Sequence, residues 1–235
     1  MLAVAASLEP LVVVNNLRKS FREGEQEHSL FRDLSTAIMR GERVALLGRS
    51  GSGKSTLLNL LCGIDLPDGG EVLLDGVNLT RLSERERTLL RRRDIGFVFQ
   101  FFNLIPTLTV LENLLLPLEL NKLLTPARRA QAEQLLSEVG LADRAASYPD
   151  RLSGGEQQRI AVARAVVHQP KLLLADEPTG NLDEQTAEKL LRLLDDLVRR
   201  HAMTLILVTH SQEAARIADR VVHIHEGQLV TVGEV

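Results

Sequence analysis

The chain has 235 residues, of which 44% are hydrophobic and 25% charged, a composition typical of a globular domain with a sizeable core. Its 28 basic and 31 acidic side chains give a net charge of −3, so charge offers no reason to expect nucleic acid as a partner. One cysteine excludes an internal disulfide, and 3% aromatic residues argue against stacking surfaces for single-stranded nucleic acid.

Neither a secretory signal nor a membrane-spanning helix is predicted. The N-terminal segment has no basic stretch and reaches Glu9 and Pro10 too early for a signal peptide, so a cytoplasmic protein is expected. The most apolar stretch, residues 104–120, is interrupted by two glutamates and an asparagine. Any role at a membrane would therefore depend on a partner.

Short apolar runs predict strands in the first 80 residues. These runs are residues 11–14, 34–38, 43–47, 71–74 and 77–79. Asp75 and Gly76, between the last two runs, are a strong signal for a hairpin turn. The N-terminal part is therefore expected to contain antiparallel strands.

From Ser83 the apolar pattern becomes helical. Ser83 and Glu86 have the spacing of a capping box, and Thr125 with Pro126 predicts the start of another helix. Gly140 is expected to end that second helix, because glycine adopts the left-handed conformation found after many helix ends.

The C-terminal third alternates between strand and helix patterns. Apolar runs at 171–175 and 204–208 predict strands on either side of an amphipathic helix. The apolar stripe of that helix consists of Ala187, Leu190, Leu191, Leu194 and Val198. Strand, helix and strand in this order predict a parallel, right-handed crossover. Residues 220–225 and 229–232, separated by Gly227, predict a closing hairpin.

A glycine-rich motif lies between the strand at 43–47 and an apolar helix at 56–62. Its residues are Gly48, Arg49, Ser50, Gly51, Ser52, Gly53, Lys54 and Ser55, with Thr56 at the start of the helix. Such a loop directs backbone N–H groups and the helix N-terminus toward phosphate. Lys54 would contact the β- and γ-phosphates, and Ser55 would bind Mg²⁺. The alternative is a simple strand-to-helix turn, but the match of eight residues and both flanks favours phosphate binding.

Two carboxylates follow the predicted strand at 171–175. Asp176, at the carboxyl end of the strand, is placed to hold Mg²⁺. Successive side chains along a strand point in opposite directions, so Glu177 is aimed differently and is a candidate general base for an attacking water. A solvated turn is the alternative, and the glycine-rich motif makes it the weaker one. A metal site together with a base predicts hydrolysis.

A third motif, Leu-Ser-Gly-Gly-Glu-Gln-Gln-Arg at 152–159, begins a predicted helix. With it, the sequence resembles the nucleotide-binding subunits of ATP-binding-cassette (ABC) transporters over about residues 12–232. By this resemblance the ordered motifs are the Walker A motif (48–55), the Q-loop glutamine (Gln100), the signature (153–157), the Walker B motif (172–177), the D-loop (180–183) and the switch histidine (His210).

The resemblance implies an α/β fold. It implies a P-loop NTPase core with a mostly parallel sheet and flanking helices, an antiparallel β subdomain, and an inserted α-helical signature subdomain. The whole chain, 1–235, would be one ABC ATPase domain. Its catalytic lobe would comprise about residues 1–98 and 168–235, and its helical subdomain about residues 99–167.

The signature motif is expected to form a second phosphate site. Ser153 would cap the helix, and Gly154 and Gly155 leave the approach open, so hydroxyl, amides and helix dipole converge on an anion. The site comprises residues 153–156 and so includes Glu156. The resemblance implies that it faces the Walker A loop of a second copy of the chain. Two ATP molecules would then be enclosed between two copies.

Four further residues gain roles mainly from the resemblance. His210 would contact the γ-phosphate, Gln100 would ligate Mg²⁺ or the attacking water, and Asp183 would cap a helix and contact the second copy. Phe21 stands where the family often has a tyrosine that stacks on adenine, and a phenyl ring also stacks. The alternative for the histidine and the phenylalanine is a structural role, and the glutamine taken alone could equally be a solvated strand end.

Two stretches, 152–159 and 176–183, are similar to the MacB/LolD/YbbA group of these ATPases. That similarity implies an integral-membrane permease as partner, of lipoprotein-release, macrolide-efflux or peptide-export type, with the chain bound at the cytoplasmic face of the inner membrane. Phe101 and Phe102 cannot both face one core, so one is expected to face a partner. A groove near residues 100–108 would receive a short helix of the permease, and packing within the helical lobe is the alternative.

Two other functions remain open. An ABC protein with a regulatory or cell-division role would bind ATP without transport, and only the identity of its partner distinguishes it. A soluble P-loop phosphotransferase would lack the signature at 152–159, which argues against it. The sequence does not indicate the transported substrate.

Overall fold

The computed structural model describes residues 9–24, 26–49 and 51–232. Residues 1–8, on which the prediction of no secretory signal depends, and Ser50 of the glycine-rich loop lie outside the described residues. The chain forms two compact units, Met1–Arg91 with Thr204–Val235 (unit 1) and Arg92–Met203 (unit 2). The two lobes predicted from the sequence have other boundaries than these two units. The division into a catalytic lobe and a helical subdomain remains a prediction.

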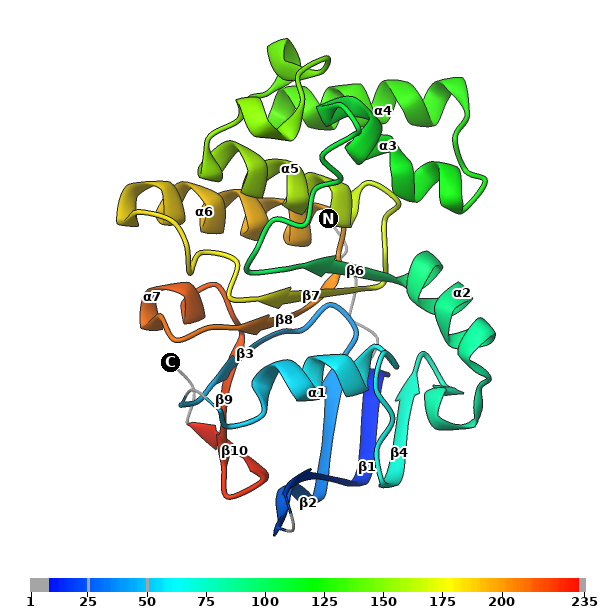
Figure 1. Ribbon diagram of the computed structural model, residues 1–235, viewed down its shortest axis with the longest axis vertical. Helices are drawn as coiled ribbons and strands as arrows, with labels where there is room; N and C mark the ends of the chain where they lie inside the picture. Colours follow the sequence, from blue (N-terminus) through cyan, green and yellow to red (C-terminus); the bar gives the residue numbers. More distant parts are fainter. Residues whose placement is uncertain (1–8, 25, 50, 233–235) are drawn as a thin grey trace, which may run out of the picture. The chain divides into compact units, whose positions relative to one another are not determined.

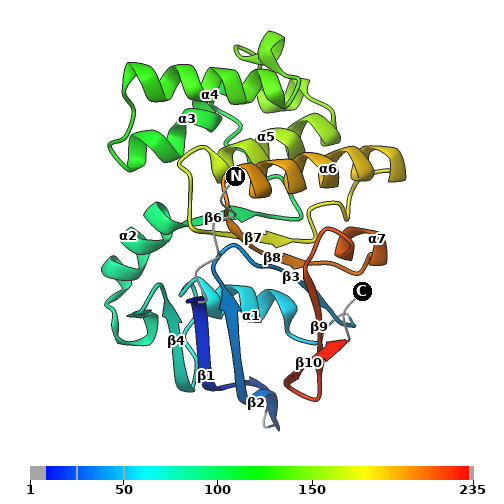
Figure 2. The same ribbon diagram turned by 180° about the vertical axis from the view of Figure 1, so that it is seen from behind.

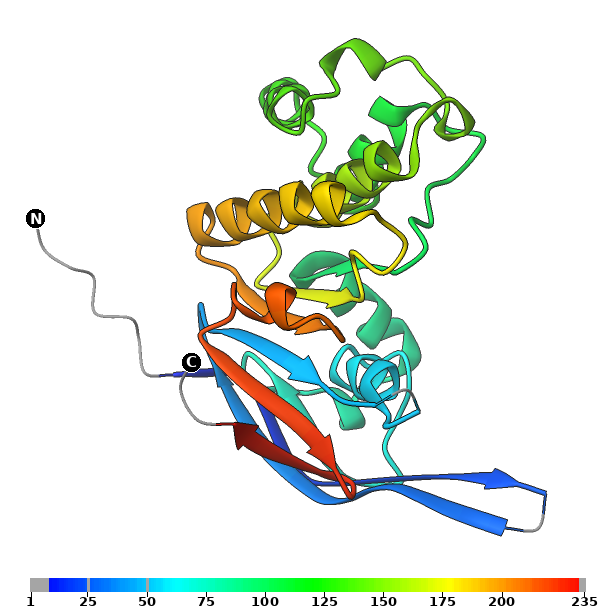
Figure 3. The same ribbon diagram turned by 90° about the vertical axis from the view of Figure 1, so that its left-hand side faces the viewer.

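Unit 1 contains an antiparallel sheet with the strand order β2-β1-β4-β5. Its strands are β1 (Pro10–Glu23), β2 (Gln26–Met39), β4 (Gly69–Leu74) and β5 (Val77–Asn78). Asp75 and Gly76 connect β4 to β5 with φ angles of 50° and 75°, as the predicted turn requires. The ends of β1 and β2 extend beyond the other strands of unit 1 (Figure 3).

The other strands of unit 1 are mostly parallel. They are β3 (Arg43–Leu47), β8 (Thr204–Val208), β9 (Arg220–His225) and β10 (Gln228–Val232), in the order β10-β9-β3-β8. β3 pairs in parallel with both β8 and β9, and β10 closes an antiparallel hairpin with β9. All five residues of β3 and of β8 are buried, as expected for parallel strands covered on both faces.

The helices of unit 1 follow its strands. α1 (Lys54–Leu61) comes after β3 and lies beside β1, β2 and β4 (Figure 1), and α7 (Gln212–Ala215) comes after β8. α2 (Glu84–Asp94) begins in unit 1 and ends in unit 2. The predicted capping box is present, since the hydroxyl and N–H of Ser83 both donate to Glu86 Oε2.

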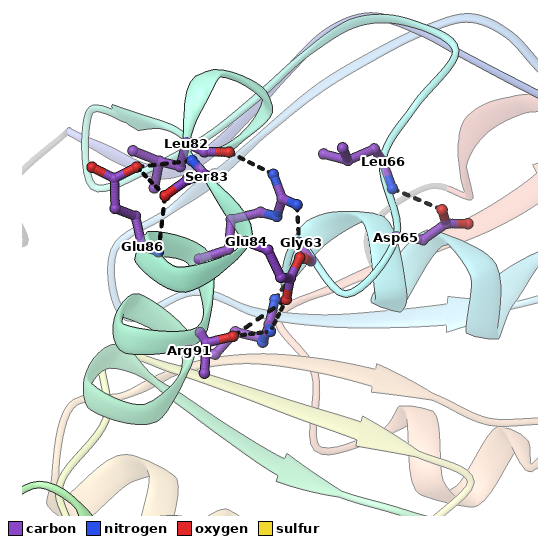
Figure 4. A network of polar contacts seen from close by, with 10 residues as sticks. Gly63, Asp65, Leu66, Leu82, Ser83, Glu84, Glu86 and Arg91 are labelled. Atoms are coloured by element: carbon purple, nitrogen blue, oxygen red, sulfur yellow. Dashed lines mark hydrogen bonds and ion pairs between the residues drawn. The ribbon is translucent and has the colours of Figure 1, made fainter.

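A polar network joins α2 to the turn after α1 (Figure 4). The Arg91 guanidinium donates to the Gly63 carbonyl over 2.6 Å and to Glu84 over 2.8 Å. Arg87, which is buried, donates to Glu84 over 2.7 Å. Hydrogen bonds from Arg91 and Arg87 lower the pKa of Glu84 to about 2, so its carboxylate stays charged. A side chain at Gly63 would collide with Arg87, because its Cβ would lie 2.9 Å from Cδ.

Unit 2 contains two parallel strands and four α-helices. These are β6 (Ile95–Val98), β7 (Leu172–Asp176), α3 (Val110–Leu120), α4 (Pro126–Glu138), α5 (Gly154–Val166) and α6 (Glu184–Arg200). Figure 2 shows α5 and α6 side by side, next to β6 and β7. Short 3₁₀ turns occupy Leu79–Arg81 in unit 1 and Ala142–Arg144 and Pro149–Arg151 in unit 2.

The core of unit 2 lies among its helices. It includes Leu114 and Leu118 of α3, Leu136 of α4 and Ile160 of α5, all at most 1% exposed. α4 ends as predicted, with Gly140 at φ 72° just after the last turn. Among the described residues no helix combines the length and apolarity needed to cross a bilayer.

Candidate functional site

The glycine-rich loop leaves the N-terminus of α1 open. Gly53 is the N-cap, with a φ of 98°, and as a glycine it supplies no side-chain cap. Gly51 also has a left-handed φ, 77°. The first turn carries no acidic residue, so the positive end of the helix dipole favours an anion there.

Lys54 folds back over this loop. Its side chain is buried, and its ammonium donates to the carbonyl oxygens of Gly48 and Arg49 over 2.9 and 3.0 Å. The hydroxyl of Ser52 is buried with no hydrogen-bond partner among the described residues, and a Cβ at Gly48 would lie 2.7 Å from it. A buried cation, an unsatisfied hydroxyl and open amides fit a phosphate group. Ser55, in the same turn, is exposed and Thr56 is half-buried.

His210 lies at the same sheet edge as this loop. β3 and β8 run in parallel with Leu46 opposite Val208, so their carboxyl ends coincide. The N–H of Thr209 donates to the Leu46 carbonyl over 3.2 Å, and His210 follows as an exposed residue before α7. Unit 1 thus brings the phosphate loop and the predicted switch histidine to one edge.

Phe21 is an exposed aromatic residue on β1. Half of its surface is exposed, and its ring stacks on His28 of β2 with ring centres 5.4 Å apart. The two residues are directly opposite each other in the β1–β2 register. The sequence analysis did not single out His28, because its proximity to Phe21 depends on the hairpin register.

In unit 2, Gln100 and Glu177 meet at the carboxyl ends of β6 and β7. Val98 lies opposite Ala175 in this parallel pair, so the following residues leave the strands at one edge. A Cβ built on Gly180 would lie 3.2 Å from Gln100 Nε2 and 3.5 Å from Glu177 Oε2. The amide and the carboxylate therefore flank the same glycine. Glu177 has a left-handed φ of 46°, a rare conformation for glutamate that is more common at functional sites.

Three side chains that the sequence analysis did not propose hold the backbone around Gln100. Gln158, fully buried on α5, donates to the Phe99 carbonyl over 3.1 Å, and Asn181 donates to the Gln100 carbonyl over 3.0 Å. Arg164, also on α5, donates to the carbonyls of Phe102 and Asn103 over 3.1 and 2.7 Å. Burial of this guanidinium lowers its pKa. Gln158 and Asn181 lie inside recognised motifs, whereas Arg164 lies outside them.

The two adjacent phenylalanines separate as predicted. Phe101 is 69% exposed, whereas the ring of Phe102 lies close to Gly154, where a Cβ would be 3.4 Å away. Gly155 is packed more closely, since its Cβ would lie 2.5 Å from a methyl carbon of Thr186 on α6. A side chain at Gly155 would therefore displace Thr186, whereas a Cβ at Gly154 would make ordinary contact with Phe102.

A capping box closes the N-terminus of α5. Ser153 Oγ accepts from the N–H of Glu156 and donates to Glu156 Oε2 over 2.7 Å. The N–H of Ser153 donates to the same carboxylate oxygen over 2.8 Å. These hydrogen bonds lower the pKa of Glu156. Asp183 caps α6 by accepting from the N–H of Thr186 over 3.0 Å. Hydrogen bonds with the side chain and the backbone N–H of Thr186 lower the pKa of Asp183.

The residues expected to bind Mg²⁺ are Ser55, Gln100 and Asp176. Among the described residues, no three His, Cys, Asp or Glu side chains cluster closely enough to hold a metal ion. A hydroxyl, an amide and one carboxylate nevertheless suit Mg²⁺, which prefers oxygen ligands and keeps several waters or phosphate oxygens. Ser55 belongs to unit 1, and the other two belong to unit 2.

Comparison with known proteins identifies the family. Residues 31–180 match the family model described as ABC transporter. The ABC transporter ATP-binding protein Rv0986 of Mycobacterium tuberculosis is 53% identical, over 94% of this chain and 90% of that protein. The lipoprotein-releasing system ATP-binding protein LolD of Legionella pneumophila (strain Paris) is 44% identical, over 93% of this chain and 96% of LolD.

A solved structure agrees with these matches. The dimeric, post-hydrolysis structure of the ATP-binding cassette MJ0796 with ADP and Pi is 39% identical, with a TM-score of 0.86 over 95% of this chain and 98% of that one. The chain therefore belongs to the ABC transporter family, as an ATP-binding member. The predicted α/β fold and the predicted similarity to the LolD group are confirmed.

Proposed function

We propose that the chain hydrolyses ATP and that this hydrolysis drives a separate membrane permease. The observation that carries the proposal is the convergence of the Gln100 amide and the Glu177 carboxylate on Gly180 at the ends of β6 and β7. An amide and a carboxylate at one strand edge can orient a water molecule and accept its proton. Membership of the ABC transporter family supplies the substrate class.

Each predicted residue then has a role in binding or in chemistry. The loop from Gly48 to Thr56 holds the phosphates, with Lys54 as the counter-charge and Phe21 stacked on adenine. Mg²⁺, when bound, neutralises charge on the β- and γ-phosphates, and Ser55, Gln100 and Asp176 would hold it.

The chemical step transfers the γ-phosphoryl group to water. Glu177 accepts a proton from water as the water oxygen bonds to the γ-phosphorus. The bond to the ADP oxygen breaks and leaves its electron pair on ADP. His210 positions the γ-phosphate and the attacking water.

We propose further that two copies of the chain act together. Residues 153–156 of one copy would face the phosphate loop of the other, and Asp183 would contact the second copy. The dimeric structures of MJ0796, one of them with ADP and Pi, support this arrangement. ATP bound between two copies favours the closed state, and its hydrolysis removes that preference.

The partner is expected to be an integral-membrane permease. The LolD relatives, named for lipoprotein release, support this type of partner over macrolide efflux or peptide export. The exposed Phe101 ring is the side chain expected to contact it. Bound to such a permease, the chain would lie at the cytoplasmic face of the inner membrane. Identifying the membrane protein that co-purifies with the chain tests this part, and a partner without transport activity would favour a regulatory role.

Glu177→Gln tests hydrolysis. The variant should bind Mg-ATP normally but hydrolyse it at least about 100-fold more slowly, because it lacks the proton acceptor. It should also accumulate as an ATP-bound dimer on a sizing column. Glu133→Gln, on the exposed surface of α4, is the matched control and should turn over normally. Normal turnover by Glu177→Gln would contradict the proposal.

A further inference from the structure

The same capping box occurs at three helix N-termini of this chain. At α2, α3 and α5 the hydroxyl of Ser83, Thr109 or Ser153 donates to a glutamate three residues later, over 2.6, 2.8 and 2.7 Å. The backbone N–H of the same residue donates to the same carboxylate oxygen in each case. The capping box is therefore a recurrent local structure among the described helices. Of these three boxes, the one at α5 lies in the signature motif.

The capping box at α5 uses the hydroxyl proton of Ser153, which a phosphate at this helix end would need as a hydrogen-bond donor. A serine hydroxyl has one proton, and a carboxylate can only accept hydrogen bonds. While Glu156 accepts from Ser153 Oγ, that hydroxyl has no proton to give to another acceptor. A phosphate that takes the proton leaves Glu156 charged and without this bond.

The charge at α5 is only partly balanced. Arg144 lies at the edge of ion-pair range, with its Nε 4.0 Å from Glu156 Oε1, and it lies closer to Asp143, at 3.6 Å. Arg159 is occupied with the carbonyl of Val139 over 3.0 Å. The Glu156 side chain is 23% exposed, so water screens its charge incompletely. A second anion at this helix end would be repelled.

We propose that Glu156 weakens the ATP-bound dimer, because its carboxylate competes with the γ-phosphate held by the second copy for the hydroxyl proton of Ser153. The inference rests on the proposed function, since it requires the signature of one copy to face ATP on the other. Glu156 is then a positioning residue that acts through Ser153, and it does not bind phosphate itself. Its effect keeps the dimer readily reversible.

Glutamine at this position would not compete in the same way. Its neutral amide oxygen can replace the carboxylate oxygen that accepts from the N–H and hydroxyl of Ser153, but it holds the hydroxyl proton more weakly and carries no charge to repel a phosphate. Glutamine also preserves the capping box, so the helix start remains satisfied. Glu156→Gln therefore weakens the competition for the hydroxyl proton with little change in folding.

The test measures dimer formation rather than turnover. In a Glu177→Gln background, the ATP concentration that gives half-maximal dimer is measured by analytical ultracentrifugation at fixed protein concentration. Adding Glu156→Gln should lower this concentration about tenfold, the size expected when a charged competitor for a hydrogen bond is removed. Adding Glu86→Gln or Glu112→Gln, which alter the matched boxes at α2 and α3, should leave it unchanged.

A double-mutant cycle separates the competition from other effects of charge. In a Ser153→Ala background there is no hydroxyl proton to compete for, so Glu156→Gln should shift the half-maximal ATP concentration much less. The melting temperature of Glu156→Gln should stay near that of its parent.

An unchanged or raised ATP requirement for Glu156→Gln, with the parent still dimerising, would overturn this inference and leave the proposed function standing. Failure of the Glu177→Gln parent to dimerise with ATP would instead overturn the proposed dimer.

Discussion

The N-termini of α1 and α5 are both expected to face phosphate, yet they are built differently. α1 begins at a glycine with a left-handed φ, has no side-chain cap and has no acidic residue in its first turn. α5 begins at Ser153 with a complete capping box and Glu156 in its first turn. One helix start leaves its donors to a ligand, and the other satisfies its donors internally.

Because of this difference, the N-terminus of α1 is expected to bind phosphate more strongly than the N-terminus of α5. At α1 the open N–H groups, the helix dipole and the buried Lys54 ammonium all favour an anion, with no carboxylate in the turn to oppose them. At α5 a phosphate must displace an existing charged hydrogen bond. In the proposed dimer, this difference would let one copy hold ATP firmly while its contact with the second copy stays weak enough to reverse.

The largest effect is expected at α1. Lys54→Ala should weaken ATP binding by at least about 100-fold, because a buried triphosphate loses its counter-charge. Isothermal titration calorimetry measures this affinity, and Lys189→Ala on the exposed surface of α6 is the matched control. Equal affinities of the two variants would break the comparison, because the open helix end would then not be a phosphate site.

A transplanted carboxylate should make α1 resemble α5. Thr56 occupies the third position of α1, as Glu156 does in α5. Thr56→Glu should bind ATP about tenfold more weakly than Thr56→Gln, since the two variants differ mainly in charge. Isothermal titration calorimetry on both variants measures the effect of that charge on ATP affinity. If they bind equally well, the absence of acids from this turn has no bearing on nucleotide binding.

Removing the serine caps should separate stability from dimerisation. Ser153→Ala and Ser83→Ala should each lower the free energy of unfolding by about 1 kcal/mol, the usual cost of a lost N-cap. Only Ser153→Ala should also raise the ATP concentration needed for dimer formation. Urea unfolding and sedimentation measure the two quantities. A matching loss of dimer in Ser83→Ala would show that stability alone controls assembly.

The smallest effect is expected just beyond the other end of α5, where His168 is buried. Burial lowers its pKa, although hydrogen bonding with the backbone of Ile95 and the charge of the Asp94 carboxylate oppose the shift. The unfolded chain therefore binds the proton more readily, so stability should fall as pH drops below about 6.5. His168→Leu should lose less stability over this range than the parent, as measured by melting temperature. His201→Leu, exposed at the end of α6, should follow the parent.

Much of the fold could be predicted from apolar periodicity. The strands at 43–47, 204–208 and 220–225 have the predicted bounds, and the first two are buried along their whole length, as is typical of parallel strands covered on both faces. β1 and β2 were predicted too short. Each has 14 residues, and the outer part of each, which includes the exposed Arg22 and His28, is held by backbone pairing with several shifts of register. Hydrophobic periodicity has no signal for such an extension.

The candidate site could be predicted as residue types but not as contacts. The glycines, Lys54 and Ser153 carry local signals, since phosphate loops and caps depend on neighbours in sequence. The pairing of Phe21 with His28 depends on hairpin register. The contact of Arg164 with the carbonyl of Asn103 spans 61 positions and depends on helix packing. Single-sequence patterns report neither.

The side-chain hydrogen bonds to the backbone around Gln100 have a consequence for how the sequence can evolve. The hydrogen bonds in this segment are accepted by main-chain carbonyl oxygens, which every amino acid has, and are donated by Gln158, Arg164 and Asn181. Replacement of the outward-facing ring at Phe101 would therefore leave those bonds in place. A lineage can therefore change the side chain proposed to contact the permease without disturbing the glutamine next to it.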